Sequence, residues 1–112
     1  MALDRAGILS VDDLAVREVA VPQWGGETVR LREWSGAERL NAVKVSESRD
    51  EHEHNALVVV LSAVDDDGAL LFTLDDIGPL LDKSAAAVAV LAVEIMDLNG
   101  LIEKEPGALE KN

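Results

Sequence analysis

Apolar and polar residues alternate along two short stretches near the start of the chain, which is the period of strands with one buried face. Between them, Gly25 and Gly26 can take the positive φ angles of a tight reversal. The pattern predicts a β-hairpin over residues 16–34. Because a two-stranded ribbon alone is marginal in water, its apolar face must rest on other elements. That face consists of Val19, Val21, Val29 and Leu31.

A helix is predicted directly after the hairpin. Ser35 and Glu38 have the spacing of a capping box, in which each side chain satisfies a backbone N–H of the other residue, so the helix covers residues 36–50. The apolar run 57–64 has the length of a buried strand, and its three consecutive valines favour one. It also suits the buried half of a helix over residues 50–64. Periodicity leaves both open, and we favour the helix.

The second half of the chain is divided by residues that favour turns and caps. Residues 65–68, Asp-Asp-Asp-Gly, predict a turn. Thr73 caps a short helix, which Gly78-Pro79 interrupts because proline lacks a backbone donor. Ser84 caps a helix over residues 85–98, and Asn99-Gly100 ends it.

The ends of the chain are less regular. Residues 1–15 predict a short helical turn entering the hairpin, with Ser10 as its cap and Asp12 and Asp13 in its first turn. Residues 101–112 predict a flexible tail.

These elements predict a mainly α (α+β) fold: a small N-terminal β-hairpin followed by a bundle of about three to four helices. Residues 1–100 form a single domain, divided into the hairpin at 16–34 and the helical part at 35–100. Apolar residues make up 48% of the chain and aromatic residues 3%, so the core must consist of Leu, Val, Ile and Ala. The absence of cysteine excludes disulfides, thiol catalysis and Cys-ligated zinc.

The chain is acidic, with a formal net charge of −12. Residues 50–112 carry fourteen acids and three bases, a net charge of −11. This balance argues against general affinity for nucleic acid or anionic membranes, because both require a basic surface. The longest apolar run, residues 85–93, is half the roughly 18 residues of a membrane span, and the N-terminus lacks the apolar stretch of a signal peptide.

No local pattern supports catalysis or a bound cofactor. Asp65, Asp67 and Gly68 resemble part of a calcium loop, but the first ligand and the terminal Glu are missing, so a turn is the better interpretation. His52 and His54, two residues apart, diverge on a helix and favour a solvated polar patch over a metal site. The sequence therefore predicts a non-enzymatic protein without catalytic, metal-binding or cofactor-binding residues.

Two features are candidates for partner binding. Trp24 lies at the predicted hairpin turn, where it either packs over the hairpin or anchors a partner, since tryptophan is enriched in interface hot spots. Val88, Leu91 and Ile95 form a stripe on the last helix, and they are either core residues or, with an adjacent groove, a receptor for a partner's helix.

The order of several motifs resembles the small tail assembly chaperones of long-tailed, siphovirus-like bacteriophages and prophages. The first half carries V-x-V-P-x-W-G-G over residues 19–26, then Val29-x-Leu31-Arg32 and Ser35-Gly36-Ala37-Glu38-Arg39. The second half carries Asp65 to Gly68, Leu71-Phe72-Thr73, Asp75-Asp76 and Lys83-Ser84 before an apolar helix. The resemblance covers roughly residues 8–100, and its specificity lies in the order and spacing of the pieces.

The resemblance implies a mostly helical, non-enzymatic protein of the host bacterial cytoplasm. Such proteins are thought to bind the tape-measure protein, to keep its long hydrophobic helices soluble, and to help recruit tail tube protein. The family is often produced also as a longer frameshifted form, of which this chain would be the short one. Two other functions stay open: a structural tail or connector component of the virion, and a regulator that mimics an acidic ligand. The sequence leaves a monomer and a homo-oligomer equally open.

Overall fold

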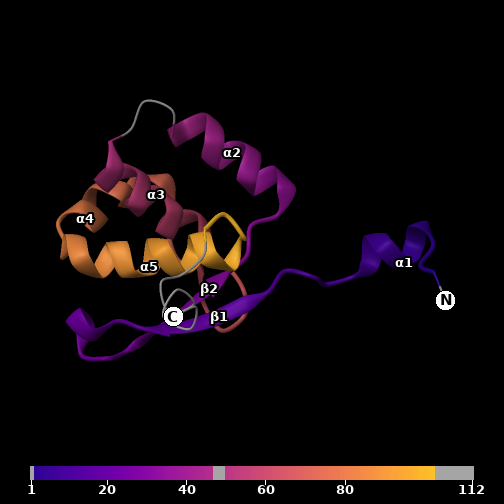
Figure 1. Ribbon diagram of the computed structural model, residues 1–112, viewed down its shortest axis with the longest axis horizontal. Helices are drawn as coiled ribbons and strands as arrows, with labels where there is room; N and C mark the ends of the chain where they lie inside the picture. Colours follow the sequence, from indigo (N-terminus) through magenta and orange to yellow (C-terminus); the bar gives the residue numbers. More distant parts are fainter. Residues whose placement is uncertain (1, 47–49, 103–112) are drawn as a thin grey trace, which may run out of the picture.

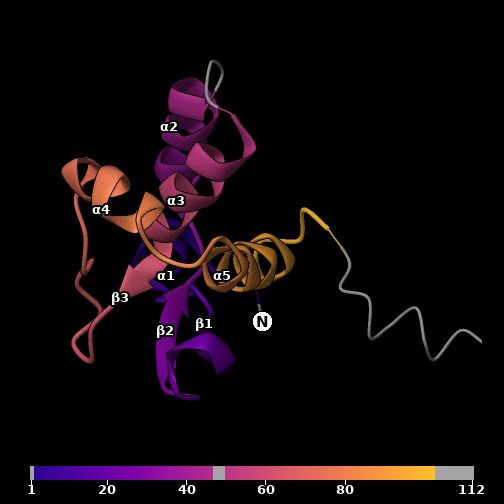
Figure 2. The same ribbon diagram turned by 90° about the vertical axis from the view of Figure 1, so that its left-hand side faces the viewer.

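The computed structural model describes residues 2–46 and 50–102. Its central element is an antiparallel sheet with the order β1-β2-β3, formed by β1 (Val16–Ala20), β2 (Thr28–Arg32) and the two-residue β3 (Ala63–Val64). Helices α3 (Glu51–Ser62) and α5 (Ala85–Leu98) pack against one another on one side of the sheet (Figures 1 and 2). The fold is therefore a helical layer on a small sheet.

The predicted hairpin is confirmed. Val19 pairs with Val29 across β1 and β2, and the turn between them contains the short 3-10 helix η1 (Pro22–Trp24). Gly25 and Gly26 have φ angles of 72° and 77°, the left-handed region that glycine enters without a steric penalty. The apolar face predicted for the hairpin faces the helices, with Val19, Val21 and Leu31 buried and Val29 packed against them.

Helix α2 (Gly36–Ser46) begins where the capping box predicted it. The Glu38 backbone N–H donates to Ser35 Oγ at 3.2 Å, and the Ser35 N–H donates to Glu38 Oε1 at 2.9 Å. Beyond Ser46, the predicted continuation to residue 50 crosses residues 47–49, which lie outside the described residues. Asp50 itself caps the next helix, so the helix predicted over 36–50 does not reach that residue.

Helix α3 confirms the helical interpretation of residues 50–64 up to Ser62. Asp50 and Glu53 form a second capping box, the first turn is polar, and every residue from Ala56 to Ser62 is buried. Burial on all sides outweighs the β-propensity of the three valines. The helix was predicted wrongly for the final two residues: Ala63 and Val64 leave the helix and pair with β2 as β3, so the strand alternative for residues 57–64 holds only for these two.

The segment after β3 contains the predicted turn and a helix that differs from the prediction. The Asp65 carboxylate accepts the N–H of Asp67 at 2.8 Å and that of Ala69 at 3.0 Å, which closes the turn. Thr73 caps the 3-10 helix η2 (Leu74–Asp76), which continues as α4 (Ile77–Leu81). Pro79 does not interrupt this helix, because it lies in the first turn of α4, where no N–H is needed.

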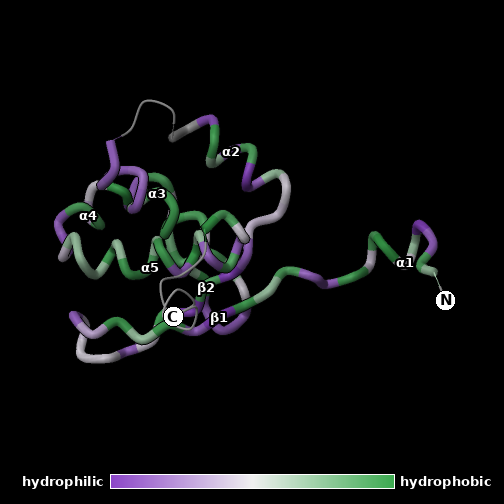
Figure 3. Tube along the Cα trace, viewed as in Figure 1, coloured by the Kyte–Doolittle hydropathy of each residue, from purple (hydrophilic) through white to green (hydrophobic). Residues whose placement is uncertain are grey.

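Helix α5 confirms its predicted bounds and its Ser84 cap, whose hydroxyl accepts the Ala87 N–H at 3.2 Å. Figure 3 shows that apolar positions continue along most of this helix and the second half of α3. The core that results is built almost entirely from aliphatic side chains, as the composition predicted. Its largest fully buried apolar side chains are Val21, Leu31, Leu57, Val58, Val59, Val60, Leu91 and Ile95.

The N-terminal segment differs most from its prediction. A helix is present, α1 (Arg5–Ser10), but Asp4 caps it and Ser10 is its last residue, so the predicted Ser10 cap is wrong. Residues 11–15 are not helical. Figure 1 shows α1 standing apart from the sheet and the other helices. With α1 and α4, the described residues contain five α-helices rather than three to four. The predicted tail is described only to Ile102, since residues 103–112 lie outside the described residues.

Candidate functional site

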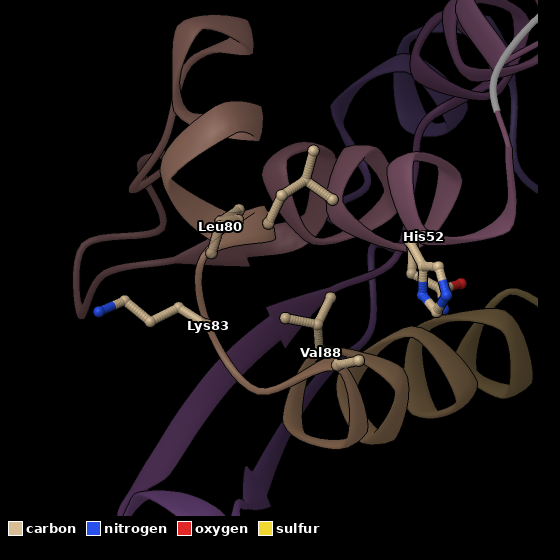
Figure 4. Close-up of a pocket in the computed structure, with 7 residues that line it drawn as sticks. His52, Leu80, Lys83 and Val88 are labelled. Atoms are coloured by element: carbon tan, nitrogen blue, oxygen red, sulfur yellow. The ribbon is translucent and has the colours of Figure 1, made fainter.

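An apolar groove runs between α3, α4 and α5, and we call it the α3–α5 groove. Leu80 of α4 and Val88 of α5 lie across it from one another, while His52 of α3 lies at one end and Lys83 extends away at the other (Figure 4). Its volume is about 280 Å³. This is just below the roughly 300 Å³ at which small-molecule sites begin, so the groove suits a few inserted side chains better than a cofactor. It is lined by His52, Asn55, Leu80, Leu81, Lys83, Ala85 and Val88.

The chemistry of the groove is an apolar floor with a polar rim. Leu80 and Val88 are buried, and Leu81 has 42% of its surface exposed. His52, exposed, and Asn55, half-buried, come from the polar first half of α3. An amphipathic helix of a partner, with apolar side chains at every third or fourth position, is the kind of ligand that such a surface receives.

A second concavity beside β2 and β3 is much more polar. It contains Glu18, Arg30, Asp65 and Asp66, together with apolar residues such as Val29 and Leu71. Arg30 donates to Glu18 at 2.8 Å, and the hydrogen bond to Glu18 is the main reason that the pKa of Arg30 is raised. These charges already pair within the protein, which makes this surface a poorer receptor for an apolar ligand.

The stripe on α5 predicted to bind a partner is interior. Val88, Leu91 and Ile95 are 5%, 1% and 0% exposed and belong to the core that α5 forms with α3 and the hairpin. Val88 also lines the α3–α5 groove, which opens to solvent. Core packing, the alternative given from the sequence, accounts for Leu91 and Ile95.

Trp24 is half-buried at the tip of the hairpin, where it packs against the core. The η1 turn that carries it contacts α5. The packing of Trp24 on its own domain accounts for its burial. Whether its exposed part meets a partner stays a prediction.

The two histidines diverge, as their spacing predicted. His52 lines the α3–α5 groove, whereas His54 lines a different groove beside α2. Among the described residues, no group of three His, Cys, Asp or Glu side chains has the arrangement of a metal site. In the same part of the chain, each helix is too short or too polar to cross a lipid bilayer.

Three polar contacts hold α5 in place, and the sequence did not indicate them. Arg17 of β1 donates to Asp97 at 2.8 Å and to Glu94 at 3.0 Å. The hydrogen bond that Arg17 donates to Asp97 is the main reason that the pKa of Arg17 is raised; burial opposes the shift, and the hydrogen bond to Glu94 adds to it. Asn99, at the end of α5, accepts the backbone N–H of Trp34 at 2.9 Å.

The sequence did not assign the residues of the α3–α5 groove other than Val88 to a binding surface, because folding brings them together from distant positions. They come from two stretches that are distant in sequence, residues 52–55 and 80–88. The adjacent Leu80 and Leu81 after Pro79 were the available signal, because neighbouring positions on a helix point about 100° apart and here only Leu80 is buried.

The arrangement of these elements has a counterpart among solved structures. No known protein family matches the sequence, and no curated protein is similar to it. The tail assembly chaperone of bacteriophage HK97 is similar in structure, with a TM-score of 0.62 and 23% sequence identity. The similarity covers 85% of this chain and 88% of that protein. The chain therefore has a fold like that of a phage tail assembly chaperone.

Proposed function

We propose that this protein is a phage tail assembly chaperone. In the host bacterial cytoplasm it binds the tape-measure protein and assists assembly of the tail tube, without catalysis. The observation that carries the proposal is the fold similarity to the HK97 chaperone over most of both chains. The ordered motifs of the sequence, from the Val-Pro-Gln-Trp-Gly-Gly turn to Lys83-Ser84, support the same class from an independent direction.

The α3–α5 groove is the surface that we assign to the tape-measure protein. A long, apolar client helix would place side chains from successive turns between α4 and α5, over Leu80 and Val88. Leu81 on the rim would be covered, and because 42% of it is exposed, this burial is worth about 1 kcal/mol, less than half of the value for a fully exposed leucine. The net charge of −12 would keep a complex with an aggregation-prone client dispersed.

Co-expression with the tape-measure protein of the same phage tests the proposal. We expect the wild-type chain to hold the tape-measure protein in the supernatant and to co-purify with it. Leu81→Glu places a charge on the rim of the groove, and we expect it to reduce binding by roughly tenfold or more, because an inserted client would have to bury that charge.

Leu71→Glu is the matched control. Leu71 is 51% exposed and lines the more polar concavity, so its replacement should leave binding unchanged. Equal loss in both variants, or in neither, would remove the α3–α5 groove from the proposal. Failure of the wild-type chain to bind the tape-measure protein would overturn the function itself.

The sequence also left open a structural component of the virion. Mass spectrometry of finished particles separates the two functions, because an assembly chaperone is absent from the particle and a component is present. Co-purification of the tail tube protein with the chain, only while the tape-measure protein is present, would support its recruitment to the same complex.

A further inference from the structure

The N-terminal arm, residues 2–15, is apolar, although it lies outside the body of the protein. None of the residues of α1 is buried, and Ile8 and Leu9 are 59% and 68% exposed. The radius of gyration is 15.4 Å, against about 13 Å for a compact chain of this length, which agrees with the extended arm in Figure 1. A helix of six residues is not stable alone in water, so the arm requires a surface to pack on.

A complementary surface lies beside α2, and we call it the α2 groove. It has a volume of about 160 Å³ and is apolar apart from Arg39 and His54. Leu40 and Val43 of α2 add further apolar surface beside it, since they are 67% and 60% exposed. The groove is lined by Trp34, Arg39, Ala42, Val43, His54, Met96 and Leu101.

The charges of the arm and of α2 are opposite. The arm carries Asp4, Asp12 and Asp13 against Arg5, a net charge of −2, while α2 carries Arg39 and Lys44, both exposed, against Glu38, a net charge of +1. Arg39 also donates to the backbone carbonyl of Asn99 at 2.7 Å. In a chain of net charge −12, most surfaces of one copy repel those of another. The basic residues of α2 mark a face on which an acidic arm of a second copy is attracted.

The arm leaves the domain next to the α2 groove. Ala15 and Glu33 exchange hydrogen bonds of 2.8 and 3.1 Å, and Glu33 precedes Trp34, which lines the groove. The root of the arm and the groove therefore lie at the same end of the molecule, while the arm extends away from it (Figure 1). Two copies related by a two-fold axis at this end can insert each arm into the other's groove, which closes the assembly as a dimer.

From these features we propose that the protein self-associates by reciprocal exchange of its N-terminal arms, with α1 of one copy packed in the α2 groove of the other. The exposed leucine and isoleucine of α1 fill the groove and cover Leu40 and Val43. The aspartates of the arm face the basic residues of α2.

Cysteine cross-linking tests this contact directly, because the natural chain has no cysteine. Chains that carry Ile8→Cys are mixed with chains that carry Val43→Cys, and the mixture is oxidised. One of the two variants carries a tag, so that the two chains differ in size on a gel. A disulfide between the two different chains is the expected product. Ile8→Cys mixed with Leu71→Cys is the control, since Leu71 is similarly exposed but lies in another groove, and it should give little product.

Sedimentation of the untagged full chain provides the second measurement. We expect a dimer for the wild type. Leu9→Glu should weaken the affinity of the dimer by roughly tenfold or more, because the arm residue is then charged where it should be buried. Circular dichroism of Leu9→Glu should be unchanged, since the residue contributes nothing to the core. Leu71→Glu should remain a dimer.

Four results would overturn the proposal. A wild-type chain that stays monomeric at every concentration would do so. Equal cross-linking of the Leu71→Cys control would also overturn it. So would a disulfide that forms only within a single chain carrying both Ile8→Cys and Val43→Cys, because the arm would then lie in its own groove. A dimer that survives Leu9→Glu but is lost when residues 103–112 are removed would assign the groove to the tail instead.

Discussion

The buried amide of Asn99 joins the end of α5 to the junction between β2 and α2. Its Oδ1 accepts the backbone N–H of Trp34 at 2.9 Å, and its Nδ2 donates to the carbonyl of Ile95 at 2.8 Å. The Ile95 carbonyl also accepts the backbone N–H of Asn99 at 3.0 Å, so it keeps a partner if the side chain is removed. Among the described residues, the Trp34 N–H has no second acceptor, so it is the one group that loses its hydrogen-bond partner in Asn99→Ala.

The magnitude follows from that difference. An unsatisfied buried donor costs about 1–3 kcal/mol, so we expect Asn99→Ala to lower the free energy of unfolding by about 2 kcal/mol. With a urea m-value of about 1–2 kcal/mol/M for a chain of this size, the midpoint should fall by roughly 1–2 M. Asn41→Ala, at an exposed position of α2, is the matched control and should change stability by less than about 0.5 kcal/mol.

Urea unfolding followed by tryptophan fluorescence gives the midpoint, and amide hydrogen exchange gives the fate of the donor. The Trp34 amide should be protected in the wild type and should exchange faster in Asn99→Ala than the amides of α3. An unchanged midpoint together with unchanged protection of Trp34 would refute the reasoning, because the hydrogen bond would then contribute nothing to stability.

Three further substitutions test individual contacts by urea unfolding. Gly26→Ala should lower the free energy of unfolding by about 1–2 kcal/mol, because φ is positive at that position. Gly36→Ala, in the first turn of α2, should leave it unchanged or raise it by up to about 1 kcal/mol. Equal effects of the two substitutions would contradict the turn geometry. Ser84→Ala should cost about 1 kcal/mol by loss of the α5 cap, and Ser84→Asp should restore most of it. Arg17→Met should cost no more than about 1 kcal/mol, since the ion pairs are partly exposed, and the loss should shrink in high salt.

The parts of the fold that were predictable rest on local signals. The hairpin was predictable because alternation and a glycine pair act within a few residues. The starts of α2 and α5 were predictable because Ser35 and Ser84 bond to N–H groups three residues away. Helix α3 followed from the interpretation of its apolar run as the buried half of one helix.

The parts that were missed depend on contacts between distant segments. The short strand at Ala63 could not be separated from the helix before it, because what fixes it is pairing with Leu31, which is more than thirty positions earlier. The ion pairs of Arg17 depend on Glu94 and Asp97 of α5, which are more than seventy positions later in the sequence. The α3–α5 groove exists only after α4 has folded across α3, so its members share no pattern in the sequence. The start of the N-terminal helix was predicted at the wrong residue, because aspartate and serine are equally good caps. The backbone conformation of the folded chain makes Asp4 the cap and Ser10 the last residue of the helix.

Helix α3 continues into β3 without an intervening loop, since Ser62 ends one and Ala63 begins the other. The hairpin of β1 and β2 can close early, because its contacts are local in sequence. The third strand cannot be added until α3 has docked, and docking of α3 presents β3 to the sheet in the same movement. Completion of the sheet and formation of the helical core are thus one kinetic event. We therefore expect the amides of α3 and of β2 to exchange through a single global opening with the same free energy, while α1 exchanges independently of both.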